Sequence, residues 1–300
     1  MEIATTAATP VVQDRTPARA SGAHYMDAKS GNTQVAYRQA LRDFGDALAI
    51  EDVTPDRITD EALCRYVEIR SETHKPGTIA ARVSILRTLA SDAGCPVIGD
   101  HHRDAMKAVT RAKGARPAQA KGFALADYHR ALANCPDTMQ GKRDAALIAL
   151  AYCTASRASE LIAYRIEDID EDARTILLRR SKTDQDGKGA EKHLSTDALD
   201  TIAAWTAAAG IDTGPIVRSV NRGGNVGGGM TTRAMAKIVK RLLGEDYSPH
   251  SVRVGFVQSA LAKGHTDGEI ALTTGQSAQT IRRYAEKTDQ RHSAAAKMLG

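Results

Sequence analysis

Hydrophobic residues recur at helical spacing along most of the chain, and strand-like patterns are rare. The first such segment places Val35, Leu41, Phe44 and Leu48 on one face. Similar stripes, with capping residues or a Pro-Gly start and a Gly stop, predict helices over 32–50, 59–70, 75–94 and 100–113. Residues 1–30 are rich in Ala, Thr and Pro without an apolar period, which predicts a disordered tail. We therefore expect a helical N-terminal domain over 31–110.

A second domain is predicted over 123–300 from a pattern that mixes helices with one strand pair. Residues 124–135 and 141–164 have helical patterns. The segments "RTILLRRSK" and "EKHLS" then resemble strands joined by the turn "TDQDGKGA". Helical patterns return over 197–209, 231–243, 249–263, 267–273 and 277–286, and a short amphipathic piece ends the chain. The predicted fold class is mainly α: a helical N-terminal domain plus an α+β domain with a small antiparallel sheet.

Charge and composition narrow the class of partner. The net charge of +5 and the pI near 9.0 favour a polyanion. The predicted linker, 111–122, has no apolar face. It contains four basic residues: Arg111, Lys113, Arg116 and Lys121. A solvated linker and a linker that follows a phosphate backbone both fit this composition.

The spacing of the cysteines and the length of the apolar runs indicate in which cellular compartment the protein is expected. The four cysteines form no CxxC pair, which disfavours zinc and favours a reducing compartment. The longest apolar run, "AALIALAYC", is too short to span a bilayer, and the N-terminus lacks a signal-peptide pattern. We expect a cytoplasmic protein.

Two segments resemble ligand-binding loops but lack residues that those loops require. "NRGGNVGGGMT" at 221–231 lacks the Lys-Ser/Thr of a phosphate-binding loop, and a flexible loop is expected there. "DIDEDARTILLR" has Ala173 where a calcium loop needs glycine and Arg179 where it needs glutamate. With no DxD or HExxH cluster either, the sequence predicts no catalytic metal and no cofactor.

Three segments of the second domain carry reactive residues at informative spacing. In "TASRASELIAY", Arg157 and Glu160 are three residues apart, on one face of a helix. In "PHSVRVGF", His250 and Arg253 are likewise one turn apart. Tyr284 follows in "TTGQSAQTIRRYAE". An Arg–Glu pair, a helix-start histidine and a half-buried tyrosine are each common structural features, so each segment alone is weak.

Together with Lys182, at the end of the first predicted strand, these residues can transfer a phosphoryl group without a metal. Two arginines can bind the non-bridging oxygens of a phosphodiester and stabilise the added charge of the transition state. A tyrosine hydroxyl is a weak nucleophile at neutral pH and needs a base, which His250 can supply. A lysine on a hairpin can give a proton to the leaving 5′-oxygen. The product would be a covalent phosphotyrosine.

These motifs, in this order, resemble the tyrosine recombinases, also called phage integrases. "SRASEL", "RRSKT", "HSVR" and the late tyrosine carry the resemblance, and "HSVRVG", "SKT…GAEKHLS" and "TTRAMAKIV" are similar to the Cre type over about residues 32–290. The resemblance implies a C-shaped clamp on double-stranded DNA with an inverted-repeat site. It also implies a monomer that assembles as a homotetramer on two sites, a Holliday junction and no cofactor.

The same resemblance implies the role of each site residue. Arg157, His250 and Arg253 would hold the scissile phosphate, with Glu160 in support. Lys182 would be the general acid. Tyr284 would attack to give a 3′-phosphotyrosine.

DNA-reading residues are implied less directly. The helix "TTRAMAKIVKRLLG" would enter a major groove with Arg233 and Lys237 on its exposed side, although a docked helix with a solvated basic side has the same pattern. Arg82 and Arg87 in "TIAARVSILR" are candidates of the same kind in the first domain. The terminal piece, 290–299, resembles a segment that docks onto a neighbouring protomer, and a frayed tail is the alternative.

One departure from the family pattern lies just before the nucleophile. Family members usually carry His or Trp directly after a Gly, and that side chain donates to the phosphate. Counting back from Tyr284 at the usual interval reaches Gly275, and counting forward from Arg253 reaches Gln276, so the segment is one residue short. Gln276 can still donate a hydrogen bond. A DNA-binding protein that has lost cleavage, and a topoisomerase without site preference, therefore remain as alternatives to a site-specific recombinase.

Overall fold

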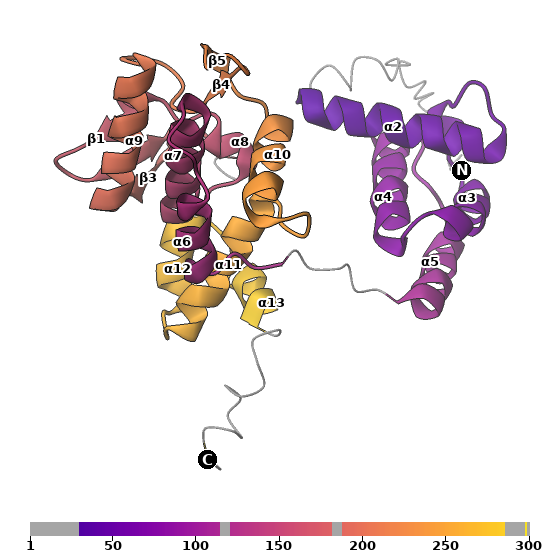
Figure 1. Cartoon of the computed structure of the whole chain (residues 1–300). Coiled ribbons are helices and arrows are strands. Elements are labelled where there is room, and N and C mark those ends of the chain that lie inside the picture. The colour runs from indigo at the N-terminus through magenta and orange to yellow at the C-terminus, as the bar shows by residue number, and fades with distance from the viewer. Residues whose placement is uncertain (1–29, 115–120, 182–187, 286–297, 299–300) are drawn as a thin grey trace, which may run out of the picture. The chain divides into compact units, whose positions relative to one another are not determined.

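The computed structural model describes residues 30–114, 121–181, 188–285 and 298 of the chain (Figure 1). They fall into two compact units, unit 1 within Met1–Ala118 and unit 2 within Gln119–Gly300. The described parts are mainly helical and carry small antiparallel sheets, which confirms the predicted fold class.

Unit 1 is a bundle of helices around one core. Its elements are α2 (Gly31–Leu48), η1 (Pro55–Arg57), α3 (Asp60–Thr73), α4 (Pro76–Asp92) and α5 (His101–Lys113). Ser30 and Thr59 cap α2 and α3 with their side chains, and Pro76 begins α4, as expected for residues with these start preferences. Most of the predicted stripes face inward: Phe44, Leu63, Tyr66, Ile79 and Leu86 are fully buried. The prediction was wrong for Val35, which is 49% exposed because it lies in the first turns of α2, away from the core.

Unit 2 packs its helices around α7, which contacts α6, α8, α9, α11, β3 and β4. The helical elements are α6 (Leu125–Ala133), α7 (Met139–Thr154), α8 (Ala158–Leu161), η2 (Ile166–Asp168), α9 (Thr196–Ala209), α10 (Thr232–Leu243), α11 (Pro249–Ala262), α12 (Asp267–Thr274) and α13 (Ala278–Ala285). The expected single helical stretch over 141–164 is interrupted, because Ala155 adopts a left-handed backbone with φ 45° at the end of α7.

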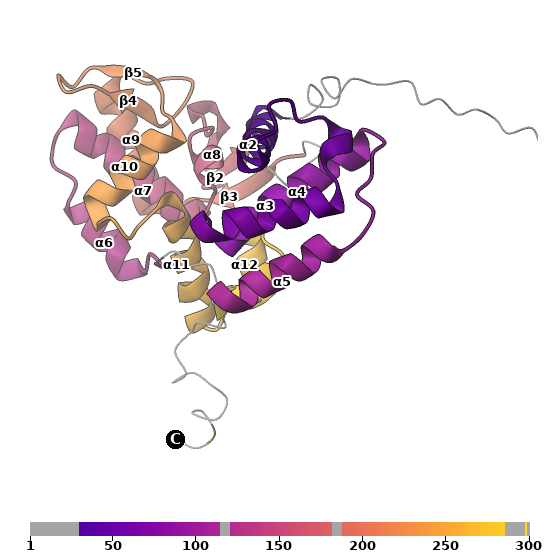
Figure 2. The same cartoon turned by 90° about the vertical axis from the view of Figure 1, so that its right-hand side faces the viewer.

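Two small antiparallel sheets complete unit 2. The first has the order β1 (Ile169–Asp170), β2 (Thr175–Leu178) and β3 (Ala190–His193), with Ile176 paired to Lys192. The second pairs β4 (Arg218–Val220) with β5 (Val226–Gly229). The expectation of a flexible loop over 221–231 was therefore wrong, because the glycine-rich run returns as a strand. This hairpin lies at the opposite end of unit 2 from α11 and α12 (Figure 1 and Figure 2).

A third, smaller cluster joins the last three helices. Val257 of α11, Ile270 of α12 and Ile281 of α13 are almost fully buried against one another, and Tyr284 packs on them. This cluster sets the position of the tyrosine on which the candidate site depends.

Candidate active site

The break between α7 and α8 positions Arg157 and Glu160. Arg157 is the residue before α8, and Glu160 is the third residue of that helix. The Glu160 carboxylate accepts hydrogen bonds from the Arg157 backbone N–H at 2.7 Å and from its guanidinium Nη1 at 2.6 Å. Glu160 is buried, whereas the Arg157 side chain keeps 30% of its surface exposed. The guanidinium is thus held at one edge while it remains open to solvent.

Arg253 lies inside unit 2, with only 2% of its surface exposed. Its Nη1 donates to the carbonyl of Ala155 at 2.9 Å, and its Nη2 donates to the carbonyl of Thr274 at 2.5 Å. The left-handed backbone at Ala155 is costly for a non-glycine residue and persists where its carbonyl binds a buried cation. Arg253 therefore connects the α7–α8 break to the end of α12.

His250 and Tyr284 meet although they are far apart in sequence. His250 is in the first turn of α11, and Tyr284 is in α13. The Tyr284 hydroxyl lies 3.2 Å from His250 Nε2, within hydrogen-bonding distance. This contact brings the candidate nucleophile to the candidate base.

The charges of the site act on one another. Burial, and then the neighbouring Arg157, lower the pKa of Arg253 to about 10, so its guanidinium stays charged at neutral pH. Desolvation, and then Arg253 and Arg157, lower the pKa of His250. The imidazole is therefore neutral at pH 7 and can accept a proton from Tyr284.

The Gly275–Gln276 pair lies between α12 and α13. Gly275 has a left-handed φ of 61°, which suits glycine, and its N–H donates to the carbonyl of Ala271 at 2.7 Å. The backbone N–H of Gln276 donates to Thr274 Oγ1 at 3.3 Å. Its side-chain Oε1 is buried and has no hydrogen-bond partner within the described ranges. The side-chain oxygen of Gln276, a hydrogen-bond acceptor, is thus not committed to a partner there.

Lys182 lies outside the described residues, so its predicted role stays a prediction. Lys192, which the sequence reasoning missed, is close to the site. It is 6% exposed on β3, and burial lowers its pKa, with Glu160 opposing that effect and Arg253 and Arg157 adding to it. The strand period offered a signal, because Lys192 alternates in phase with buried Leu194.

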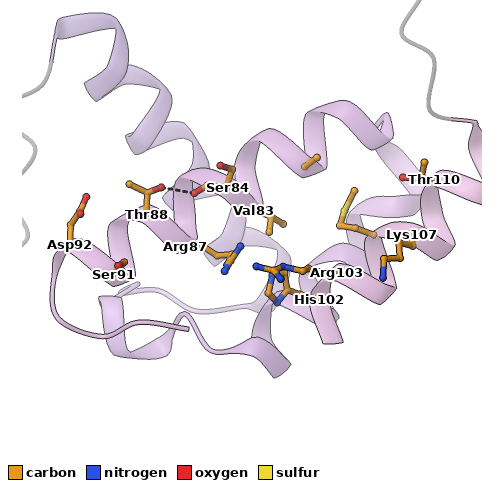
Figure 3. A pocket seen from close by; sticks show the side chains of 12 residues that line it. Val83, Ser84, Arg87, Thr88, Ser91, Asp92, His102, Arg103, Lys107 and Thr110 are labelled. Carbon is orange, nitrogen blue, oxygen red and sulfur yellow. Dashed lines mark hydrogen bonds between the residues drawn. The ribbon is translucent and has the colours of Figure 1, made fainter. Parts of the chain in front are cut away.

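The two arginines predicted for the first domain have different surroundings. Arg82 donates to Asp43 of α2 at 2.6 Å, so it ties two helices together. Arg87 lines a groove of about 720 Å³ between α4 and α5, beside His102 and Arg103 (Figure 3). Its Nε is buried without a partner in the described part of the chain.

Other predicted DNA contacts lie on the surfaces of both units. Arg111 and Lys113 are in the last turn of α5, where Lys113 donates to the backbone of Ser71. Lys121 is exposed, with its ammonium over the Tyr247 ring at 4.8 Å from the centroid. Arg233 and Lys237 are exposed on α10. Arg116 lies outside the described residues.

The described residues hold no cluster of three or more His, Cys, Asp or Glu side chains placed to bind a metal ion. His101 and His102 instead place their Nδ1 atoms 2.7 and 2.5 Å from the Asp60 carboxylate. None of the described helices is long and apolar enough to cross a membrane.

Comparison with known proteins agrees with this geometry. The integrase/recombinase xerD homolog of Selenomonas ruminantium is 28% identical over 286 residues, which cover 87% of this chain and 83% of that protein. Recombinase cre of Escherichia phage P1 is 27% identical over 212 residues, 62% of each chain. The solved Tn1549 transposon integrase has the same fold, with a TM-score of 0.70 at 14% identity over 93% of this chain and 97% of that one.

A model of the phage integrase family matches residues 123–291, more than half of the chain. The match spans Arg157, His250, Arg253 and Tyr284, the residues that the fold brings together. The chain therefore belongs to the phage integrase family, the tyrosine recombinases.

Proposed function

We propose that this chain is a site-specific DNA recombinase that breaks and rejoins strands through a covalent 3′-phosphotyrosine at Tyr284. The observation that carries the proposal is the 3.2 Å contact between the Tyr284 hydroxyl and His250 Nε2, beside two arginines that share one electrostatic environment. Family membership supports the reaction class.

The proposed cleavage step is an in-line displacement at phosphorus. Neutral His250 takes the proton of Tyr284, and the phenolic oxygen forms a bond to phosphorus while the bond from phosphorus to the 5′-oxygen breaks. Arg157 and Arg253 bind the non-bridging oxygens and stabilise the charge that develops on them. Lys182 donates the proton that the leaving 5′-oxygen needs, a role that rests on its place beside the predicted hairpin turn.

Support for the phosphate-binding arginines comes from Glu160. One Glu160 oxygen accepts from the Arg157 guanidinium and the other from the Arg157 backbone N–H, so the guanidinium is partly ordered before DNA binds. Gln276 takes the place of the usual His or Trp, and its side-chain Nε2 is proposed to donate one further hydrogen bond to the phosphate. The backbone of Gly275 supplies the turn that presents it.

The proposed partner is double-stranded DNA that carries an inverted-repeat site. The basic residues Arg87, Arg111, Lys113, Arg116, Lys121, Arg233 and Lys237 are proposed phosphate or base contacts, and Arg82 is retained with Asp43 as its partner in the free protein. The Tn1549 integrase structure contains a circular intermediate DNA, and that of XerH contains a difH substrate. By analogy, a homotetramer on two sites and a Holliday junction are proposed, with a monomer free in solution.

The test is covalent capture. DNA fragments from the source genome that the protein retains would identify its site, and a duplex of that sequence with a nick beside the cleavage position would trap the intermediate. The wild-type protein should give an adduct that resists detergent, and Tyr284→Phe should retain DNA without forming an adduct. Wild-type protein that binds its site and forms no adduct would overturn the proposal.

That negative outcome would favour a second function, a DNA-binding protein that has kept the fold and lost cleavage. The specific observation behind it is Gln276, since an amide is a weaker phosphate ligand than the family's usual side chain. Replacing Gln276 with His would then restore adduct formation.

A further inference from the structure

Lys192 is a buried cation on β3, and its side chain donates hydrogen bonds to another element, α12. Its Nζ donates to the carbonyl of Thr273 at 2.7 Å and to that of Leu272 at 3.2 Å. Both acceptors belong to the last turn of α12, far along the chain from β3. Burying an ammonium is costly unless it is fully hydrogen-bonded, so a lysine at this position needs these partners.

The last four carbonyls of α12 are all satisfied, and cations satisfy three of them. The Ala271 carbonyl accepts the N–H of Gly275, as expected where a helix ends on a left-handed glycine. Lys192 takes those of Leu272 and Thr273, and Arg253 takes that of Thr274. Positive charge at a helix C-terminus also interacts favourably with the helix dipole.

The last turn of α12, which Lys192 and Arg253 bind, is followed directly by residues of the candidate site. Gly275 and Gln276 follow the capped turn, and α13 then carries Tyr284 to His250. The other end of the connection is the β2–β3 strand pair; Lys182 follows β2 in the sequence and lies outside the described residues. The charged groups around Lys192 are Glu160, Arg253 and Arg157, all members of the site.

We propose that Lys192 is a positioning residue: its bonds to the end of α12 fix Gln276 and Tyr284 relative to the hairpin and the two arginines before DNA binds. The inference rests on the proposed function. It assigns Lys192 no proton transfer, because its donors are directed at two backbone carbonyls and the side chain is almost completely shielded from solvent.

A substrate with sulfur in place of the 5′-bridging oxygen separates positioning from acid catalysis. A thiolate leaves without a proton donor, so this substrate restores cleavage only where a general acid was lost. Lys192→Met should cleave the normal suicide duplex about 100-fold more slowly, as a displacement of about 1 Å can cause, with DNA retention unchanged. The sulfur substrate should not restore its rate, whereas it should restore that of Lys182→Met. Restoration in Lys192→Met would overturn the positioning role.

Amide hydrogen exchange gives a readout that does not depend on cleavage. In Lys192→Met, the amides of Gly275 and of α13 should exchange at least about tenfold faster, while those of α7 keep their rates. Unchanged exchange in 274–285 would overturn the inference even if the protein proved inactive on every DNA.

If the Lys192→Met protein does not fold, the Lys192→Arg protein provides the test instead. Arginine keeps the charge and the donors, and it does not give up a proton at neutral pH. If Lys192 is a positioning residue, the Lys192→Arg protein should cleave DNA within about tenfold of the wild-type rate. Its amides in 274–285 should also exchange as slowly as those of the wild type. Loss of cleavage with unchanged exchange would contradict it.

Discussion

Gly255, in the "HSVRVG" motif, allows α11 to pass very close to the start of unit 2. A Cβ at this position would lie 2.1 Å from the backbone N and O of Phe123 and 2.3 Å from its carbonyl carbon. Phe123 is fully buried, and its N–H donates to the Ser251 carbonyl at 3.0 Å. Because the atoms in the way are backbone, Gly255→Ala must push α11 and the Phe123 segment apart.

The expected cost follows from these contacts. Overpacking of a tight site costs about 1–3 kcal/mol, and a lost hydrogen bond about 0.5–1.5 kcal/mol. Alanine is the better helix former in α11 by about 1 kcal/mol, which offsets part of this cost, so we expect Gly255→Ala to lower the free energy of unfolding of unit 2 by about 1–3 kcal/mol. In a unit of this size, each kcal/mol shifts the Tm by about 2–4 °C, so a drop of roughly 2–12 °C is expected.

Differential scanning calorimetry of the full chain measures this drop. Gly268→Ala is the matched control, because a Cβ there meets nothing nearer than Thr266 Oγ1 at 3.9 Å. Gly268 lies in α12, where alanine is the better helix former, so the control should melt at or slightly above the wild-type temperature. A Tm for Gly255→Ala within about 2 °C of wild type would refute the close-approach argument.

Three further predictions concern the site and unit 1. Glu160→Gln should weaken the hydrogen bonds that hold Arg157, and since that side chain is partly exposed we expect a loss of only about 1 kcal/mol in urea unfolding, together with slower adduct formation. Because the pKa of His250 is lowered, adduct formation should stay constant as the pH falls through the usual histidine value of about 6.5, and should decline only below it as the ring takes up a proton. A decline centred above that value, or one that persists in His250→Gln, would contradict the assignment. Asp43→Asn should destabilise unit 1 by about 2–3 kcal/mol, because the carboxylate binds Tyr66, Arg70 and Arg82 at 2.5, 3.1 and 2.6 Å; thermal unfolding unchanged from wild type would argue against that network.

The sequence by itself determined the helices and the composition of the site. Period-3.6 stripes and capping residues are local properties, so the helices of unit 1 could be located from them. The order of Arg157, His250, Arg253 and Tyr284 in recognisable motifs identified the family that the comparisons then showed. Alternating residues also indicated the β2–β3 pair.

Only the tertiary structure decided how these residues meet and what else holds them. The break at Ala155 could not be predicted, since a left-handed alanine is unfavourable locally and is stabilised by a bond to Arg253 from a distant helix. The glycine-rich run over 221–231 has weak strand propensity, and its pairing with β4 is non-local. Lys192 lies in the segment "GAEKHLS", but no local pattern marks it as a site residue. Its position is explained by carbonyls of α12 that lie near it only in the folded chain. Contacts between residues far apart in sequence depend on how the helices pack, and no local pattern encodes that packing.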